Sequence, residues 1–266
     1  MSGKFGITIL GSGSKGNAAV IHGPDGAMLL DAGFSARELE HRMEQAEIEP
    51  DSIRGVLITH GHSDHTKGCR TFADRHRIQA YLTAPTLKEG DRVHFLPERK
   101  TVIAPGTPFE LCGVTVDPFT LPHDAVDTVG YTFRACGKKI GVATDLGHLN
   151  LLARQKLRGC TLLMLEANHE PELLQKSARP LQLKRRILSR HGHLSNEDAL
   201  DALAELLTPD SVSLVLAHLS SECNDREILT GMAEKTLANL GRGDILLTVA
   251  LQDAPLETFW LAQQEV

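Results

Sequence analysis

The chain has 266 residues, 41% of them hydrophobic, so it can bury a substantial core as one large domain or two small ones. Its net charge of −6 gives no overall signature of nucleic-acid binding, so any such surface must be a local patch. The five cysteines form no CxxC pair, which argues against a disulfide framework and a thiolate zinc site. Without an evident signal peptide or a run of ~20 apolar residues, we expect a cytoplasmic protein.

The first half of the chain has the pattern of strands joined by tight turns. Apolar runs predict strands at 5–10, 17–22 and 27–31, with a Gly-Pro-Asp-Gly turn between the last two. Ser35 and Glu38 form a capping box that predicts the start of a helix. The remaining elements expected in this half are strands at 55–59, 79–83, 93–96 and 101–105 and a short helix at 67–76.

The second half repeats this pattern with more helix. The expected elements are β-rich stretches at 109–121 and 129–145, a buried strand at 161–166, a helix capped by Ser195, a strand at 211–219, a helix at 225–240, and strands near 245–250 and 257–262. No linker divides the halves. Two β-rich halves with helices outside predict a sandwich of two sheets flanked by helices, folded as a single domain over residues 1–266.

A histidine-rich fragment follows the predicted strand 55–59. Alternate residues of an extended segment point the same way, so His60, His62 and Asp64 can converge, and a turn would bring His65 beside them. Imidazole and carboxylate ligands together suit zinc, manganese or iron. A chance cluster among 13 histidines is the alternative, but three histidines and an aspartate at this spacing favour a metal site.

The Gly-Ser loop at 11–16 matches GxGxxG, and Asp31 follows Gly11 at the spacing of a dinucleotide-binding fingerprint. That mechanism needs a helix after the third glycine to hold a pyrophosphate, whereas residues 17–22 predict a strand. We therefore reject a dinucleotide-binding fold. We expect this loop, with Ser14, to shape the rim of the active site and to contact a phosphate there.

Several segments, in order, carry a resemblance to a known superfamily: 29–33, 59–65, 122–123, 144–145 and 217–220. Together they resemble the metallo-β-lactamase fold superfamily. Further segments resemble the YycJ (WalJ) group of bacterial hydrolases: 11–17, 165–169, 184–188 and 192–196. The resemblance implies an α/β (α+β) fold, a four-layer αββα sandwich that binds two metal ions, and, from the YycJ group, DNA exonuclease activity.

The resemblance also implies a ligand set of seven residues: His60, His62 and His123 on one ion, Asp64, His65 and His218 on the other, and Asp145 bridging both. Asp31 would lie behind the ligands and accept a hydrogen bond that fixes one of them or its loop. Ordinary alternatives exist for three of these positions taken singly. Asp31 could be only a turn former, His123 a surface residue and Asp145 a turn cap.

A two-metal centre suits hydrolysis, because hydroxide held between the ions is a nucleophile near neutral pH. Asp64 could also orient that hydroxide. Between residues 173 and 193 lie six Lys or Arg and no acidic residue, including Lys184, Arg185 and Arg186. This basic band suits phosphate, and binding would then depend on salt, although a solvated helix face is the plain alternative.

The segment 192–195 precedes a predicted helix N-terminus, which favours anions. His193 is a candidate phosphate contact or proton donor to the leaving oxygen, and Ser195 a candidate phosphate contact. A structural role beside the helix cap is the alternative for His193. We expect a phosphodiesterase or 5′-to-3′ exonuclease on DNA. The alternatives are hydrolysis of a small phosphodiester, an RNA end, a lactone or a thioester, and a non-enzymatic binding module.

Overall fold

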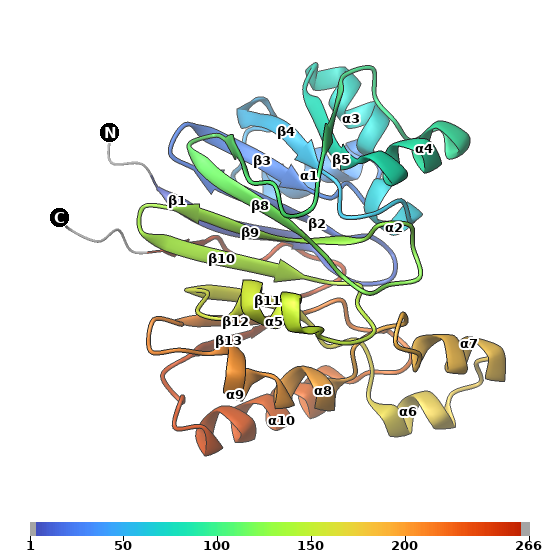
Figure 1. Ribbon diagram of the computed structural model, residues 1–266, viewed down its shortest axis with the longest axis vertical. Coiled ribbons are helices and arrows are strands. Elements are labelled where there is room, and N and C mark those ends of the chain that lie inside the picture. Colours follow the sequence, from blue (N-terminus) through green and yellow to red (C-terminus); the bar gives the residue numbers. More distant parts are fainter. Residues whose placement is uncertain (1–3, 262–266) are drawn as a thin grey trace.

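The computed structural model describes residues 4–261, which form two seven-stranded sheets packed face to face with helices on both outer faces (Figure 1). The first sheet has the order β14 (Phe259–Leu261), β1 (Phe5–Gly11), β2 (Ala18–Gly23), β3 (Gly26–Leu30), β4 (Ile53–Leu57), β5 (Gln79–Thr83), β6 (Lys100–Ile103). The second has the order β13 (Leu246–Val249), β12 (Ser213–Ala217), β11 (Leu162–Glu166), β10 (Lys138–Ala143), β9 (Val129–Ala135), β8 (Val114–Thr120), β7 (Phe109–Leu111).

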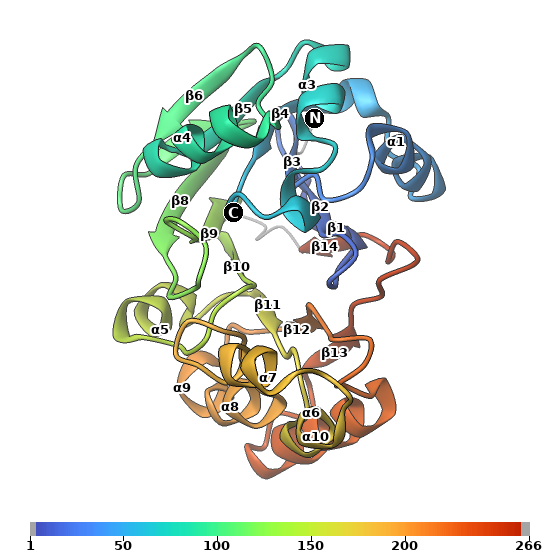
Figure 2. The same cartoon turned by 90° about the vertical axis from the view of Figure 1, so that its right-hand side faces the viewer.

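Both sheets are antiparallel at one end and parallel at the other. Strands β3 to β6 run parallel in the first sheet, and β10 to β13 run parallel in the second. The outer helices of the first sheet are α1 (Ala36–Gln45), α3 (Cys69–His76) and α4 (Ala84–Val93). Those of the second are α5 (Leu151–Leu157), α8 (Asn196–Asp201), α9 (Leu203–Leu206) and α10 (Arg226–Asn239). Short helices α2 (Ser63–Thr66), α6 (Pro171–Lys176) and α7 (Leu181–Ile187) lie toward the viewer in Figure 2.

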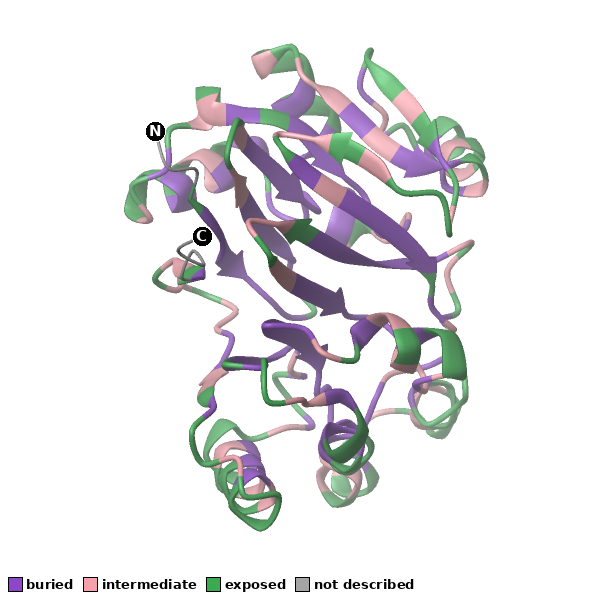
Figure 3. Ribbon diagram, turned by 60° about the vertical axis from the view of Figure 1, so that its left-hand side comes forward, coloured by how far each residue is buried: buried purple, intermediate pink, exposed green. Residues whose placement is uncertain are grey.

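Three apolar clusters separate the four layers. Ile7, Tyr131 and Val215 belong to the cluster between the sheets. A second cluster, with Leu39 of α1, joins the first sheet to its helices, and a third, with Leu229 of α10, joins the second sheet to its own. Strands covered on both faces are buried along their length, as Figure 3 shows for the inner strands. The predicted αββα sandwich is confirmed.

Most predicted elements are present, and the differences have local causes. The predicted strand 93–96 is wrong, because α4 extends to Val93 and His94 then takes a left-handed backbone conformation. Thr83 caps that helix and Pro85 lies in its first turn, a start signal that the apolar pattern did not reveal. The patterns also did not predict α5, α6 and α7. Strand β2 follows the Gly-Ser loop, so the rejection of a dinucleotide-binding fold is confirmed.

Among residues 4–261, the structure has no helix that is both long and apolar enough to cross a bilayer.

Candidate metal centre and active site

The candidate site lies where strands of both sheets end. Asp31 follows β3, and His60 lies three residues beyond β4. In the second sheet Asp145 lies beyond β10, Glu166 ends β11 and His218 directly follows β12. Because parallel strands place their carboxyl ends at the same edge of a sheet, these side chains meet in space although they are far apart in sequence.

The first three predicted ligands come together. His60, His62 and His123 each offer a ligand atom, and these atoms lie within 4.8 Å of one another. His60 and His123 are buried, whereas His62 keeps 34% of its side chain exposed. Such a group of three imidazoles could hold one divalent metal ion with room for a further ligand.

The second three also meet, with the predicted bridging residue between the groups. Asp64, His65 and His218 lie within 4.8 Å of one another, and Asp145 lies within the same distance of His60 and His65. One Asp145 oxygen is 3.0 Å from His65 Nε2, and the other is 3.5 Å from His218 Nδ1. All seven side chains of the predicted ligand set therefore surround one small region.

Unpaired atoms show that this region suits a cation. His60 Nε2, His123 Nε2 and His218 Nε2 are buried and have no hydrogen-bond partner. Leaving a buried polar atom unpaired costs about 1–3 kcal/mol, so three of them in one cluster call for a ligand. The five imidazoles and two carboxylates of the ligand set are donors that zinc and manganese accept. The residues therefore fit divalent metal ions.

In three of these rings, those of His60, His123 and His218, the second nitrogen is already engaged. His123 Nδ1 donates to the carbonyl oxygen of Gly192 at 3.0 Å, which leaves the Nε2 lone pair free for a metal ion. His60 Nδ1 lies 3.0 Å from the Thr59 hydroxyl, and His218 Nδ1 lies 2.9 Å from Glu166 Oε1. Metal-binding histidines are usually oriented in this way by a partner on the other nitrogen.

Asp31 holds the histidine-rich loop from behind. Its carboxylate accepts hydrogen bonds from the Thr59 amide at 2.8 Å and from the Thr59 hydroxyl. It also lies 2.7 Å from His65 Nδ1. Asp31, Asp145 and His218 all have left-handed backbone conformations, with φ of 58°, 60° and 56°. For non-glycine residues such conformations cost of order 1–3 kcal/mol and gather at functional sites.

The Gly-Ser loop supports the same centre. The Asn17 side chain accepts from the Ser12 hydroxyl, and that hydroxyl accepts from the His218 amide at 3.0 Å. The Asn17 amide donates to the Asp64 carbonyl at 2.8 Å. Gly33 packs against this contact so closely that a Cβ there would lie 1.7 Å from the Asp64 carbonyl oxygen. The Gly-Ser loop and the Asn17 that follows it therefore support ligands from both halves of the chain.

Glu166 is a member of the site that sequence reasoning missed. It is fully buried, and its Oε1 accepts from His193 Nδ1 at 2.8 Å and from His218 Nδ1 at 2.9 Å. Burial alone would raise the pKa of Glu166, but His193 and His218 outweigh it and lower the pKa to about 2. The available signal was a single carboxylate at the end of an otherwise apolar strand, β11.

His193 lies at the edge of the centre. Its ring centroid is 5.1 Å from that of His123 and 5.3 Å from that of His218, and 24% of its side chain is exposed. Burial lowers the pKa of His193, but the Glu166 carboxylate outweighs burial and raises it above its ordinary value. The protonated form of His193 is therefore favoured beside Glu166.

The predicted phosphate contacts divide into two groups. Ser14 and Arg186 line a cavity of about 150 Å³ that also includes His193. Lys184 Nζ instead donates to the carbonyls of Gln175 and Ser177 at 2.7 Å each, Arg185 is exposed, and the Ser195 hydroxyl caps α8. The structure places these last three basic or hydroxyl side chains outside the lining of that cavity.

Two residues next to the ligand set received no firm role from the sequence. Asn168 Nδ2 donates to the carbonyl of His218 at 2.8 Å, so it supports the ligand backbone. Asp124 reaches the first histidine group, with one carboxylate oxygen 3.4 Å from His123 Nε2. The Asp124 carboxylate also pairs with Arg186 on the basic band.

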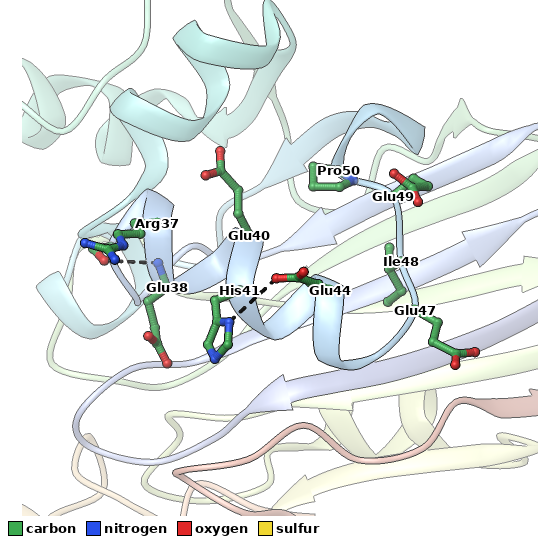
Figure 4. A pocket seen from close by; sticks show the side chains of 10 residues that line it. Arg37, Glu38, Glu40, His41, Glu44, Glu47, Ile48, Glu49 and Pro50 are labelled. Carbon is green, nitrogen blue, oxygen red and sulfur yellow. Dashed lines mark hydrogen bonds and ion pairs between the residues drawn. The ribbon is translucent and has the colours of Figure 1, made fainter.

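A larger cavity, of about 1230 Å³, lies beside α1 (Figure 4). Its lining includes five glutamates: Glu38, Glu40, Glu44, Glu47 and Glu49. None of its lining residues belongs to the ligand set. A wall of carboxylates repels phosphate, so the smaller cavity beside His193 is the better candidate for an anionic substrate.

Comparison with known proteins agrees with this architecture. A family model described as a beta-lactamase superfamily domain matches residues 27–218. The chain is 31% identical to exodeoxyribonuclease YycJ of Bacillus anthracis over 239 residues, which cover 89% of this chain and 90% of that protein. It is 30% identical to exodeoxyribonuclease WalJ of Streptococcus pneumoniae over 245 residues, which cover 90% and 91%.

A solved structure shares the fold at low sequence identity. The metallo-β-lactamase fold protein YhfI of Bacillus subtilis has a TM-score of 0.73 and 13% identity, covering 95% of this chain and 99% of that one. The match to the family model and to two relatives extends over most of the chain. The chain therefore belongs to the beta-lactamase superfamily, with the metallo-β-lactamase fold, in the group that includes YycJ and WalJ.

Proposed function

We propose that this hydrolase is a binuclear metal-dependent phosphodiesterase that acts on DNA as a 5′-to-3′ exonuclease. The observation that carries the proposal is that two groups of possible metal ligands meet near Asp145. Beside them His193, which is hydrogen-bonded to Glu166, lines a cavity together with two arginines. The relatives named exodeoxyribonuclease support DNA as the substrate.

His60, His62 and His123 would hold one ion, Asp64, His65 and His218 the other, with Asp145 shared. When bound, such ions supply an activated water and stabilise negative charge on a phosphate. Asp64 keeps 24% of its side chain exposed, which suits the additional task of orienting the nucleophile.

His193 would donate a proton to the leaving oxygen. Glu166 accepts a hydrogen bond from Nδ1 of this ring, so it fixes the orientation of the ring and favours its protonated form. Proton donation by a positioned side chain contributes typically ~10²–10⁴-fold to a rate. The Glu166 carboxylate contacts His218 as well, so it would couple the proton donor to the metal centre.

Arginine beside the centre favours a phosphodiester over a neutral ester. Arg179 and Arg186 line the cavity that reaches His193. A guanidinium matches the geometry of phosphate oxygens and gains from their charge, whereas a lactone or thioester offers no such anion. A small phosphodiester or an RNA end would use the same contacts, and direct assay separates these substrates.

The test is cleavage of end-labelled single- and double-stranded DNA and RNA, with manganese or zinc added and metal content measured. We expect degradation of DNA that disappears in His62→Ala and Asp145→Ala protein. Turnover of small esters alone would contradict the nuclease and leave the hydrolase. Undiminished DNA cleavage by both purified variants would contradict the metal mechanism.

A further inference from the structure

We propose that the small cavity beside His193 is a subsite for the 5′-terminal phosphate of the substrate strand, with Arg179 as its principal anchor. This inference rests on the proposed function. It names the chemical feature of the DNA end that the enzyme recognises.

The size of the cavity suits a phosphate group. Its volume is about 150 Å³, whereas pockets for drug-sized ligands measure ~300–1,000 Å³ and one water occupies ~30 Å³ of liquid. A whole nucleoside does not fit within it, but a phosphate with a few waters does. Its polar lining comes from segments far apart in sequence: Ser14, Asp124, Asn168, Arg179, Arg186, His193 and Ser220.

The charge of the lining favours an anion. The lining contains two guanidinium groups, those of Arg179 and Arg186, and one carboxylate, that of Asp124. Arg179 Nε lies 3.0 Å from Glu222 Oε2, and its Nη2 lies 3.4 Å from the Ser220 hydroxyl. These contacts fix the plane of the guanidinium, which has five N–H donors in all. The hydroxyls of Ser14 and Ser220 add uncharged donors of the kind that bind phosphate oxygens.

The position of Arg179 is well defined, because only 21% of its side chain is exposed. Its partner Glu222 is 65% exposed and lies outside the cavity lining. Glu222 can therefore hold Arg179 in place without presenting a negative charge to the ligand. Preorganised donors of this kind lose little freedom on binding.

A salt bridge covers the side of the cavity next to the metal centre. Arg186 pairs with Asp124, whose other oxygen lies 3.4 Å from His123 Nε2. The Arg186 side chain is 59% exposed, and exposed ion pairs are weakly held. An incoming phosphate can replace the Asp124 carboxylate as the partner of Arg186, because both present oxygen anions to the same donors.

The place of His193 in the cavity wall fixes the direction of cleavage. In the proposed reaction water adds to the scissile phosphorus, the P–O3′ bond breaks, and O3′ takes the proton of His193. The nucleotide that carries this O3′ therefore lies on the cavity side, with its own 5′-phosphate within the subsite. It leaves as a nucleoside 5′-monophosphate. The scissile phosphate stays on the shortened strand as a new 5′-phosphate, which restores the recognised end.

The experiment compares two duplexes that differ only in a 5′-phosphate or a 5′-hydroxyl, each labelled at the 3′ end, with the full-length metal-loaded protein. We expect at least a tenfold faster initial rate on the phosphorylated end, with nucleoside 5′-monophosphates as products. In Arg179→Ala protein this ratio should fall toward one. Arg179→Lys, which keeps the charge and loses the planar fork, should give an intermediate ratio.

Arg70→Ala is the matched control, because Arg70 is an exposed arginine on α3 paired with Asp74, outside the cavity lining. It should keep the wild-type ratio. Equal rates on both ends in the wild-type protein, attack from the 3′ end, or an unchanged ratio in Arg179→Ala would each overturn the subsite. The wild-type comparison needs no variant, so a folding defect in Arg179→Ala does not prevent the test. Absence of any DNA cleavage would instead contradict the proposed function.

Discussion

The two halves of the chain build one centre by different means. The first half supplies His60, His62, Asp64 and His65 from one segment after β4, the last two on the short helix α2. In the second half, Asp145, Glu166 and His218 each come from the end of a different strand. Parallel pairing brings these strand ends together, with Ala143 opposite Leu165 and Glu166 opposite Ala217. The first half therefore depends on loop geometry, and the second on the register of a sheet.

The largest effect should come from the residue that both halves share. Asp145→Ala removes an oxygen donor near His60 and His65 and leaves several imidazoles unpaired. We expect loss of both ions and a fall in activity of about a thousandfold, or ~4 kcal/mol of barrier. His62→Ala, on the half-exposed rim, should cost one ion. Elemental analysis with rate measurement distinguishes them, and full metal content in Asp145→Ala would exclude a bridging role.

The dependence of the first half on loop geometry can be tested by adding one methyl group at Gly33. In Gly33→Ala the new Cβ meets the Asp64 carbonyl at 1.7 Å, so the loop that carries the ligands must shift. We expect about a hundredfold loss of activity and a lower melting temperature. Gly231→Ala is the control, because a Cβ there meets no atom within 4 Å in helix α10. That change should stabilise the protein by about 0.5–1 kcal/mol. Normal activity and metal content in Gly33→Ala would contradict the tight loop packing.

A third comparison concerns the carboxylate that orients ligand histidines in each half of the chain, Glu166 in the second half and Asp31 in the first. Glu166→Gln should reduce activity about 10–100-fold, since partners of ligand rings usually matter to that extent. The Glu166 carboxylate raises the pKa of His193, so its loss lowers that pKa and the protonated donor disappears at a lower pH. The alkaline limb of the rate–pH profile should therefore move to lower pH.

Asp31→Asn, in the first half, is the counterpart of this change. It weakens the support of His65 and Thr59, so it should reduce metal affinity without moving the alkaline limb. Rate–pH profiles at saturating metal give the comparison. An equal shift of the alkaline limb in both variants would show that His193 does not set it.

The smallest effect lies away from the centre, in the first sheet. Burial lowers the pKa of His22 to about 4, and its Nε2 lies 2.7 Å from the Thr8 hydroxyl. In the unfolded chain the His22 ring takes up a proton near pH 6.5, whereas in the folded protein it does so only near pH 4. The contribution of neutral His22 to the free energy of unfolding is therefore complete above pH 6.5 and is lost as the pH falls toward 4. For a partly exposed ring we expect roughly 1–2 kcal/mol. Urea unfolding should show a shallower pH dependence in His22→Gln, and an unchanged slope would contradict this.

Much of the fold could be predicted because its signals are local. Apolar runs with turn residues between them locate strands such as β1, β2 and β11, and the caps Ser35 and Ser195 locate α1 and α8. The helix α4 escaped because its start depends on Thr83 at the end of a strand, where the apolar pattern continues without a break. Propensity alone does not separate such a helix from a further strand.

The sequence alone singled out the candidate metal-binding segment, because four possible donors fall within six residues. The extended geometry predicted for it is wrong at its end, since Asp64 and His65 lie on the short helix α2. Resemblance of ordered motifs supplied His123, Asp145 and His218 as further candidates. Only the tertiary structure decided that Glu166 holds His193 and His218, and that Arg179 meets Ser14 at one small cavity. Contacts of this kind depend on the register of parallel strands and on the path of the loops beyond them, which chain spacing does not specify.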